Sequence, residues 1–422
     1  MTDAPQGYYA ASSAVPVPQP SLSGDVRTGV CVIGGGYTGL SAALHLAHGG
    51  IDTILLEAHT IGFAASGRNG GQIHTGHRKE QASLEQWLGQ PHAHALWDIS
   101  EEAKALVRGL IIEHQIACDF TQGLVIAAHD KGALRELSAD TDHLHKSYGY
   151  DAVSMLDARA IVAALGTGIY PGGRMDAGGG HLHPLKFARG LAGAAHKAGV
   201  TLYENSPALS FDKNTAVVRC PQGTVAAGTI ILACDAFTGE LAPELAPYIG
   251  HVESFIAATV PLSADAGARV IPCGAAVADT RHVLDYYRKS ADNRLLFAGR
   301  ESYWNVPRDV AKIVRPRMAR VFPALAETRV DFAWRGTVGI TRTRMPHFGR
   351  LSDHVLFGHG YSGQGVALSV LGGKALADAA RGHTGKFDTL ASVPARTFPG
   401  GLVLRKPLIT AGLVWYKLMD AI

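Results

Sequence analysis

The chain has 422 residues, of which 47% are hydrophobic and 18% charged, so it is long enough for two or three domains and too apolar for a disordered protein. Its 39 Lys and Arg against 36 Asp and Glu give a net charge of +3, too balanced for an electrostatic nucleic-acid binder. Five scattered cysteines without a CxxC pair argue against a secreted disulfide framework and against a thiolate zinc site.

The first 24 residues predict a flexible tail. They contain several prolines but neither the basic start nor the apolar core of a signal peptide, so we expect a cytoplasmic protein. Residues 28–51 carry no charged side chain, yet their glycines are better explained by a ligand-binding loop than by a membrane span.

That loop has the form G-x-G-x-x-G. The apolar strand 29–33 precedes it, a helix follows, and a second strand, 53–56, ends at an acidic residue. In such a unit the glycines allow a tight turn and a close backbone approach to a pyrophosphate, which lies at the helix N-terminus. The acidic residue binds a ribose diol. The pattern predicts dinucleotide contacts, with FAD and NAD both open, at Gly34, Gly36, Tyr37, Thr38, Gly39, Glu57 and Ala58.

A second glycine-rich segment, 61–72, follows the ribose-binding acid and favours FAD. A flavin enzyme needs small residues where the chain passes beside the ring system, and hydroxyl and guanidinium groups that donate to its oxygens. The predicted contacts are Ser66, Gly67, Arg68, Asn69, Gly70, Gly71 and Gln72.

Near the end of the chain, a strand at 355–357 leads through glycines into a helix at 366–381. Together with segment 65–72 and the blocks 336–350 and 359–367, this region resembles FAD-dependent amine and amino-acid oxidoreductases of the D-amino-acid oxidase family. In that family this helix start lies by the flavin. The resemblance therefore adds Gly363, Gln364, Gly365 and Val366 to the expected cofactor contacts.

The resemblance implies an α/β fold with a discontinuous Rossmann-like FAD-binding domain and an α+β substrate domain containing an antiparallel sheet. We expect the FAD-binding domain at 25–90, 148–240 and 332–385, and the substrate domain at 91–147 and 241–331. Residues 386–422 would form a C-terminal extension, whose apolar run 402–418 reads as a packed helix. Other expected elements are helices 91–114 and 185–198, strands 200–203 and 229–233, and sheet strands near 252–260 and 293–299.

The resemblance also implies the reaction: oxidation of an amine by FAD, with molecular oxygen reduced to hydrogen peroxide. Some relatives attach FAD through a cysteine near the late block, but residues 335–350 contain none, so we expect non-covalent FAD. Within the family, the stretches 286–300 and 398–418 resemble enzymes whose substrate is gamma-glutamylputrescine, so we expect this compound or a related gamma-glutamylated amine as substrate. Oxidation or dehydrogenation of D-amino acids or N-methyl amino acids stays open, as does a flavin subunit of a hetero-oligomeric dehydrogenase. The sequence also leaves a homo-oligomer open.

Residues near the chemistry are harder to assign. We expect His74 and His359 to face the flavin, Arg300 to act in catalysis, and Tyr287 and Arg288 to contact substrate. We expect no metal, because none of the close histidine pairs has a ligand set suited to zinc: His74/His77, His143/His145 and His181/His183.

Overall fold

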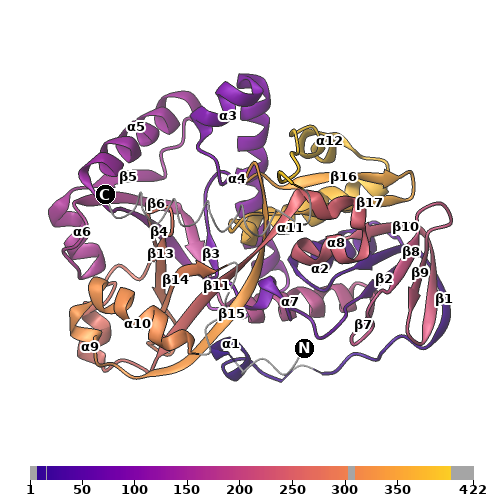
Figure 1. Cartoon of the computed structure of the whole chain (residues 1–422), viewed down its shortest axis with the longest axis horizontal. Helices are drawn as coiled ribbons and strands as arrows, with labels where there is room; N and C mark the ends of the chain where they lie inside the picture. The colour runs from indigo at the N-terminus through magenta and orange to yellow at the C-terminus, as the bar shows by residue number, and fades with distance from the viewer. Residues whose placement is uncertain (1–6, 16, 303–308, 401–422) are drawn as a thin grey trace.

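The computed structural model describes residues 7–15, 17–302 and 309–400, with only the backbone of residues 300–302. Two sheets dominate it, one on each side of the molecule in Figure 1. Within these residues, no helix combines the length and apolar character needed to cross a membrane.

The first sheet is built around five parallel strands from distant parts of the chain, in the order β17-β10-β1-β2-β7. Strand β1 pairs in parallel with β10 on one side and with β2 on the other, and β10 pairs with β17. Their apolar, β-branched ends are fully buried, as expected for central parallel strands. The strands are β1 (Gly24–Ile33), β2 (Thr53–Leu56), β7 (Thr201–Tyr203), β8 (Ser210–Asp212), β9 (Val217–Cys220), β10 (Gly223–Leu232), β16 (His347–Ser352) and β17 (Val355–His359).

Apolar helices cover one face of this sheet. Helix α2 (Tyr37–His48) packs between α7 (Pro184–Lys197) and α11 (Gly365–Ala380), and α4 (Gln90–Glu113) packs on α11. Small side chains and glycines let α2 and α11 approach closely: a Cβ at Gly373 would overlap the carbonyl oxygen of Thr38. These helices form one core cluster around Leu40, Leu44 and Leu371.

The second sheet is mostly antiparallel, with β4 and β12 as a parallel pair. Helix α10 (Val310–Val321) and helix α6 (Ala158–Leu165) pack on one face around Phe297 and Phe255. The strands are β3 (Gln72–Ile73), β4 (Thr121–Ala128), β5 (Val153–Leu156), β6 (Gly172–His181), β11 (Ile249–Thr259), β12 (Ala276–Asp279), β13 (Asp285–Lys289), β14 (Leu295–Ser302) and β15 (Val330–Thr341).

Shorter elements complete the described part of the chain. The remaining α-helices are α1 (Tyr8–Ala11), α3 (Gln81–Leu88), α5 (Lys131–Tyr148), α8 (Thr238–Leu241), α9 (Ala264–Arg269) and α12 (Gly385–Ala391). The 3₁₀ turns are η1 (Ala65–Gly67), η2 (Asp235–Phe237), η3 (Pro243–Tyr248) and η4 (Pro323–Leu325).

The expected helices and strands correspond to elements of the structure, but the sheets divide the chain differently from the expected segments. Strands β3, β5, β6 and β15, which the sequence grouped with the FAD-binding domain, pair in the second sheet. Glycine-rich β6 gave no alternating pattern by which to recognise its partners. We therefore propose an FAD-binding domain around the first sheet and a substrate domain around the second sheet, with β3, β5, β6 and β15 in the substrate domain.

The N-terminal segment is a second difference, because a flexible tail was expected. Tyr8 and Tyr9 are buried, and Tyr9 packs edge-on against Trp334 at 5.1 Å between ring centroids. The hydroxyl of Tyr8 donates to Asp292 Oδ1 at 2.5 Å. The proline content suggested disorder, but two adjacent tyrosines supply enough apolar area to dock this segment. The apolar run 402–418 lies outside the described residues.

Candidate active site

The turn after β1 has the geometry of a pyrophosphate site. Gly34 has φ +117°, a conformation that favours glycine, and a Cβ at Gly39 would overlap the Gly34 carbonyl oxygen. Helix α2 begins here without an acidic residue in its first turn, and the backbone N–H of Tyr37 donates to Ser66 Oγ at 3.0 Å. The helix N-terminus therefore offers positive potential to an anion.

Glu57 lies at the end of β2, facing the same turn. Its Oε2 accepts the N–H of Gly35 at 2.7 Å and its Oε1 accepts that of His59 at 2.9 Å. Burial raises the pKa of this carboxyl, opposed by these two hydrogen bonds. Each carboxylate oxygen keeps a second lone pair, which suits the hydroxyls of a ribose.

The segment 65–71 is held rigidly along the next stretch of the site. Asn69 Nδ2 donates to the carbonyl of Ala65 at 2.9 Å, and Asn69 Oδ1 accepts the N–H of Gly71 at 2.7 Å. From the second sheet, Arg288 Nε donates to the Gly70 carbonyl at 2.7 Å and Trp334 Nε1 to the Arg68 carbonyl at 3.0 Å. The main chain of this loop is thereby fixed for close contact with a ligand.

The loop before α11 completes this end of the site. The Asp235 carboxylate, which follows β10, accepts the Gly360 N–H at 2.8 Å, and Tyr361 OH lies 2.9 Å from Thr38 Oγ1. The first bond joins the loop before α11 to the turn after β10, and the second joins that loop to the start of α2. Gln364 Oε1 and Ser369 Oγ, side chains lining the site, have no hydrogen-bond partner among the described residues.

A single cavity of about 990 Å³ connects these pieces and extends over the second sheet. Its volume is at the upper end of the range of about 300–1,000 Å³ usual for ligand sites, which leaves room for a large cofactor and a substrate. The unpartnered Gln364 and Ser369 oxygens and the glycine-lined turn fit the polar atoms of FAD. The predicted contacts that line the cavity are Gly34, Gly36, Tyr37, Thr38, Glu57, Ala58, Ser66, Arg68, Asn69, Gly70, Gly71, Gln72, Gly363, Gln364, Gly365 and Val366.

Gly39 and Gly67, expected as cofactor contacts, do not line the cavity. A Cβ at Gly67 would overlap the carbonyl oxygen of Gly62, just as one at Gly39 would overlap that of Gly34. Both residues therefore shape the binding loops through main-chain packing rather than by touching the ligand.

Among the described side chains that we expected near the chemistry, that of His74 alone lines the cavity. Its Nε2 lies 3.2 Å from Gln72 Oε1. Burial, assisted by the positive charge of Arg78, lowers the pKa of His74 to about 4. The imidazole is therefore neutral near pH 7.

The structure places three of the other expected residues away from the cavity. His359 is fully buried, with Nε2 3.0 Å from His347 Nδ1, and Tyr287 stacks on Phe297 in the core. The guanidinium of Arg288 donates through Nε to the Gly70 carbonyl and through Nη2 to Tyr9 OH, the latter at 3.2 Å. These interpretations were wrong. Arg300 was also expected to act in catalysis; its side chain lies outside the described part.

The strand alternation of β13 explains the error at Tyr287. Neighbouring residues of a strand point to opposite faces, so Tyr286, and not Tyr287, lines the cavity. Its OH lies 2.8 Å from Ser254 Oγ of β11. Because alternate residues of a strand share a face, placing Tyr287 in the core would have placed Tyr286 on the cavity side.

The sequence missed the rest of the cavity wall over the second sheet. Trp97, Leu124 and Ile126 give this part apolar surface, and helix α5 closes it with Glu136 and Asp140. These residues form no recognisable sequence motif, because they come from separate strands and helices that meet only in the folded chain.

Behind this wall lies a buried charged network centred on Lys104. Its ammonium donates to Thr75 Oγ1 at 2.6 Å and to Tyr150 OH at 2.9 Å, and pairs with Glu101 at 2.8 Å. Asp176 accepts from Thr75 Oγ1 at 2.5 Å and from Tyr150 OH at 2.6 Å. The network fixes Thr75, the residue next to His74, in the cavity wall.

The turn, the acidic residue after β2 and the shared cavity, which extends over the second sheet, define a dinucleotide-dependent enzyme. The chain belongs to the DAO family of FAD dependent oxidoreductases, whose family model matches residues 29–379. It is an FAD-dependent oxidoreductase.

Individual relatives match along nearly the full length. The chain is 39% identical over 424 residues to gamma-glutamylputrescine oxidoreductase of Escherichia coli (strain K12), covering 100% of this chain and 99% of the relative. It is 38% identical over 404 residues to the probable oxidoreductase OrdL of Rhizobium meliloti (strain 1021), covering 95% and 94%. The crystal structure of glycine oxidase from Geobacillus kaustophilus shares the fold, with a TM-score of 0.72 at 19% identity over 84% of this chain and 95% of the other.

Proposed function

We propose that this protein oxidises gamma-glutamylputrescine, or a related gamma-glutamylated amine, to an aldehyde, with oxygen as electron acceptor. One amine, one O₂ and one water would give one aldehyde, one ammonia and one hydrogen peroxide. The proposal starts from the full-length likeness to the gamma-glutamylputrescine oxidoreductase. FAD supplies the redox chemistry by accepting the hydrogen and electron pair from the carbon beside the amine.

The structural observation that carries the proposal is a charged wall at the end of the cavity beside α5. Glu80, Glu136 and Asp140 line it together with Arg174, whose Nη1 donates to Asp140 Oδ2 at 2.6 Å. Burial raises the pKa of the Glu80 carboxyl, and the nearby charges of Asp140 and Glu136 raise it further. A cationic ligand would relieve this accumulation of negative charge.

This wall complements the amino-acid end of a gamma-glutamylated amine. The carboxylates would bind its ammonium group, and Arg174 would bind its carboxylate. The apolar surface of Trp97, Leu124 and Ile126 would cover the methylene chain and exclude water. The terminal amine would then lie near His74, whose neutral imidazole adds no positive charge and so favours the neutral form of the amine that oxidation requires.

We also propose that FAD is bound without a covalent link. All five cysteines lie in the described residues, and of these Cys234 lines the cavity, at the nucleotide-binding turn after β10. Burial raises the pKa of the Cys234 thiol to about 12, which leaves it unreactive. Acid or heat should release the yellow cofactor quantitatively into the supernatant.

The test is an anaerobic titration with gamma-glutamylputrescine, followed by the visible absorption band of the oxidised flavin. Bleaching at low substrate and recovery on admitting air, with about one hydrogen peroxide per substrate, are the expected results. Bleaching without peroxide would overturn the assignment of oxygen as acceptor. Bleaching by glycine or D-amino acids, but not by gamma-glutamylputrescine, would overturn the substrate.

A further inference from the structure

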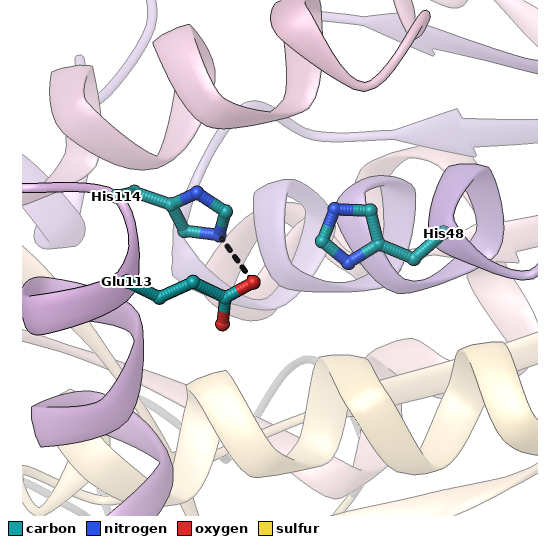
Figure 2. Close-up of side chains that lie close together, drawn as sticks. All are labelled: His48, Glu113 and His114. Atoms are coloured by element: carbon teal, nitrogen blue, oxygen red, sulfur yellow. Dashed lines mark ion pairs between the residues drawn. The ribbon is translucent and has the colours of Figure 1, made fainter.

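Outside the cavity, two histidines and a glutamate meet where helices α2 and α4 end (Figure 2). His48 is the last residue of α2, Glu113 is the last of α4, and His114 follows it. Their candidate ligand atoms all lie within 4.8 Å of one another. None of the three lines the cavity or belongs to the cofactor-binding segments.

We propose that His48, Glu113 and His114 bind a divalent transition-metal ion of the zinc type. Two imidazoles and one carboxylate are ligands that zinc accepts, with solvent in the fourth position, whereas magnesium and calcium prefer oxygen ligands alone. With bonds of about 2.0–2.1 Å, ligand atoms on a tetrahedral zinc lie about 3.3 Å apart. His114 Nε2 and Glu113 Oε1 are already 3.8 Å apart, so small side-chain rotations would close the site.

The surroundings favour a cation. Both helices point their C-terminal ends, which carry partial negative charge, toward the cluster. His114 Nε2 has no hydrogen-bond partner among the described residues, and the His48 and His114 rings lie 5.9 Å apart between centroids. Arg381, a cation close to Gly49, is itself paired with Asp378 at 3.9 Å.

A bound ion would link α2 to α4 at the ends remote from the cofactor. Both helices belong to the core cluster of the first sheet, and α2 begins at the nucleotide-binding turn. The ion would therefore stabilise the folded chain without entering the reaction. No local sequence spacing reveals this site, because its ligands come from two helices far apart in the sequence.

The test uses the flavin-loaded protein, free of any added histidine tag and stripped with a chelator. Zinc is added during calorimetric titration and thermal unfolding, with magnesium and calcium as comparison ions. We expect one zinc per chain and an unfolding temperature higher by on the order of 3 °C, with no response to the other two ions.

Three variants make the assignment specific. His48→Ala and His114→Ala should each weaken zinc binding at least as much as loss of an outer-shell partner does, about 10- to 100-fold. The matched control is His196→Ala, which removes an exposed histidine from the last turn of α7 and should leave zinc binding unchanged. Equal zinc binding by the wild type and both cluster variants, or no zinc binding by the wild type, would overturn the proposal.

Discussion

The half of the cavity beside β1, β2 and α11 presents mainly backbone N–H groups and glycines to its ligand, whereas the half beside α5 and β6 presents charged side chains. In the first half, binding depends on main-chain approach and helix N-termini. In the second, it depends on carboxylates, Arg174 and the network around Lys104. Backbone groups bind the features common to all dinucleotides, so that half suits a shared cofactor. Side chains can differ between relatives, so we propose that the other half determines the substrate.

Loss of one glycine should damage the first half most. Gly39→Val places a side chain against the Gly34 carbonyl, so the turn and the helix start must separate. We expect purified protein with little or no flavin, measured as the ratio of visible to ultraviolet absorbance. Gly193→Ala is the control, since a Cβ at that position of α7 meets no atom within 4 Å. Full flavin content in Gly39→Val would show that the backbone approach is not required.

Removing the buried ammonium of Lys104, behind the second half, should lower the stability of the fold without loss of flavin. Lys104→Met removes a lysine that is 3% exposed, and breaking a buried charge network should lower the free energy of unfolding by about 3 kcal/mol. Lys386→Met is the control. Its pair with Glu102, which lies on α4 like Lys104, is partly solvated and should contribute about 1 kcal/mol or less. Equal losses in urea unfolding would contradict this difference between buried and exposed pairs.

The carboxylates of α5 should control substrate affinity alone. Glu136 is exposed, so solvent screens its attraction for the ligand to about 1 kcal/mol or less, and Glu136→Gln should raise KM for gamma-glutamylputrescine up to about fivefold. The value of kcat and the flavin content should stay near those of the wild type. Asp142→Asn, an exposed change on the same helix outside the cavity wall, should leave KM unchanged. Parallel changes in both variants would mean that only net charge matters.

Behind the first half, the buried His359 of β17 should contribute a pH dependence to stability. Burial, with the neighbouring His347, lowers the pKa of His359 from 6.5 to about 3, so the unfolded chain binds this proton more readily than the folded one. The stabilisation is present above about pH 6.5 and is lost as the pH falls toward 3, at about 1.4 kcal/mol per pH unit. His359→Gln should make stability between about pH 6.5 and 5 less dependent on pH by that amount. An unchanged slope in urea unfolding at several pH values would contradict this.

The same contrast explains how much the sequence could predict. The glycine turn, Glu57 and the loop 65–72 lie in contiguous segments with fixed physical roles, so most of the cofactor side could be predicted. The substrate side could not, because Trp97, Leu124 and Glu136 meet only after distant elements pack together. Tyr287 was misassigned because the sequence did not show which face of β13 its side chain takes. His359 was misassigned because a residue next to the loop before α11 turned out to support the core.

The order of strands in the first sheet has a consequence for biosynthesis. β1 leaves the ribosome well before its partner β10, and β17 and the start of α11 follow later still. At about 5–20 residues per second, β1 waits on the order of 20 s for β10. The flavin site can therefore form only after the start of α11 has been translated, and until β10 arrives one edge of the apolar β1 is unpaired and open to aggregation.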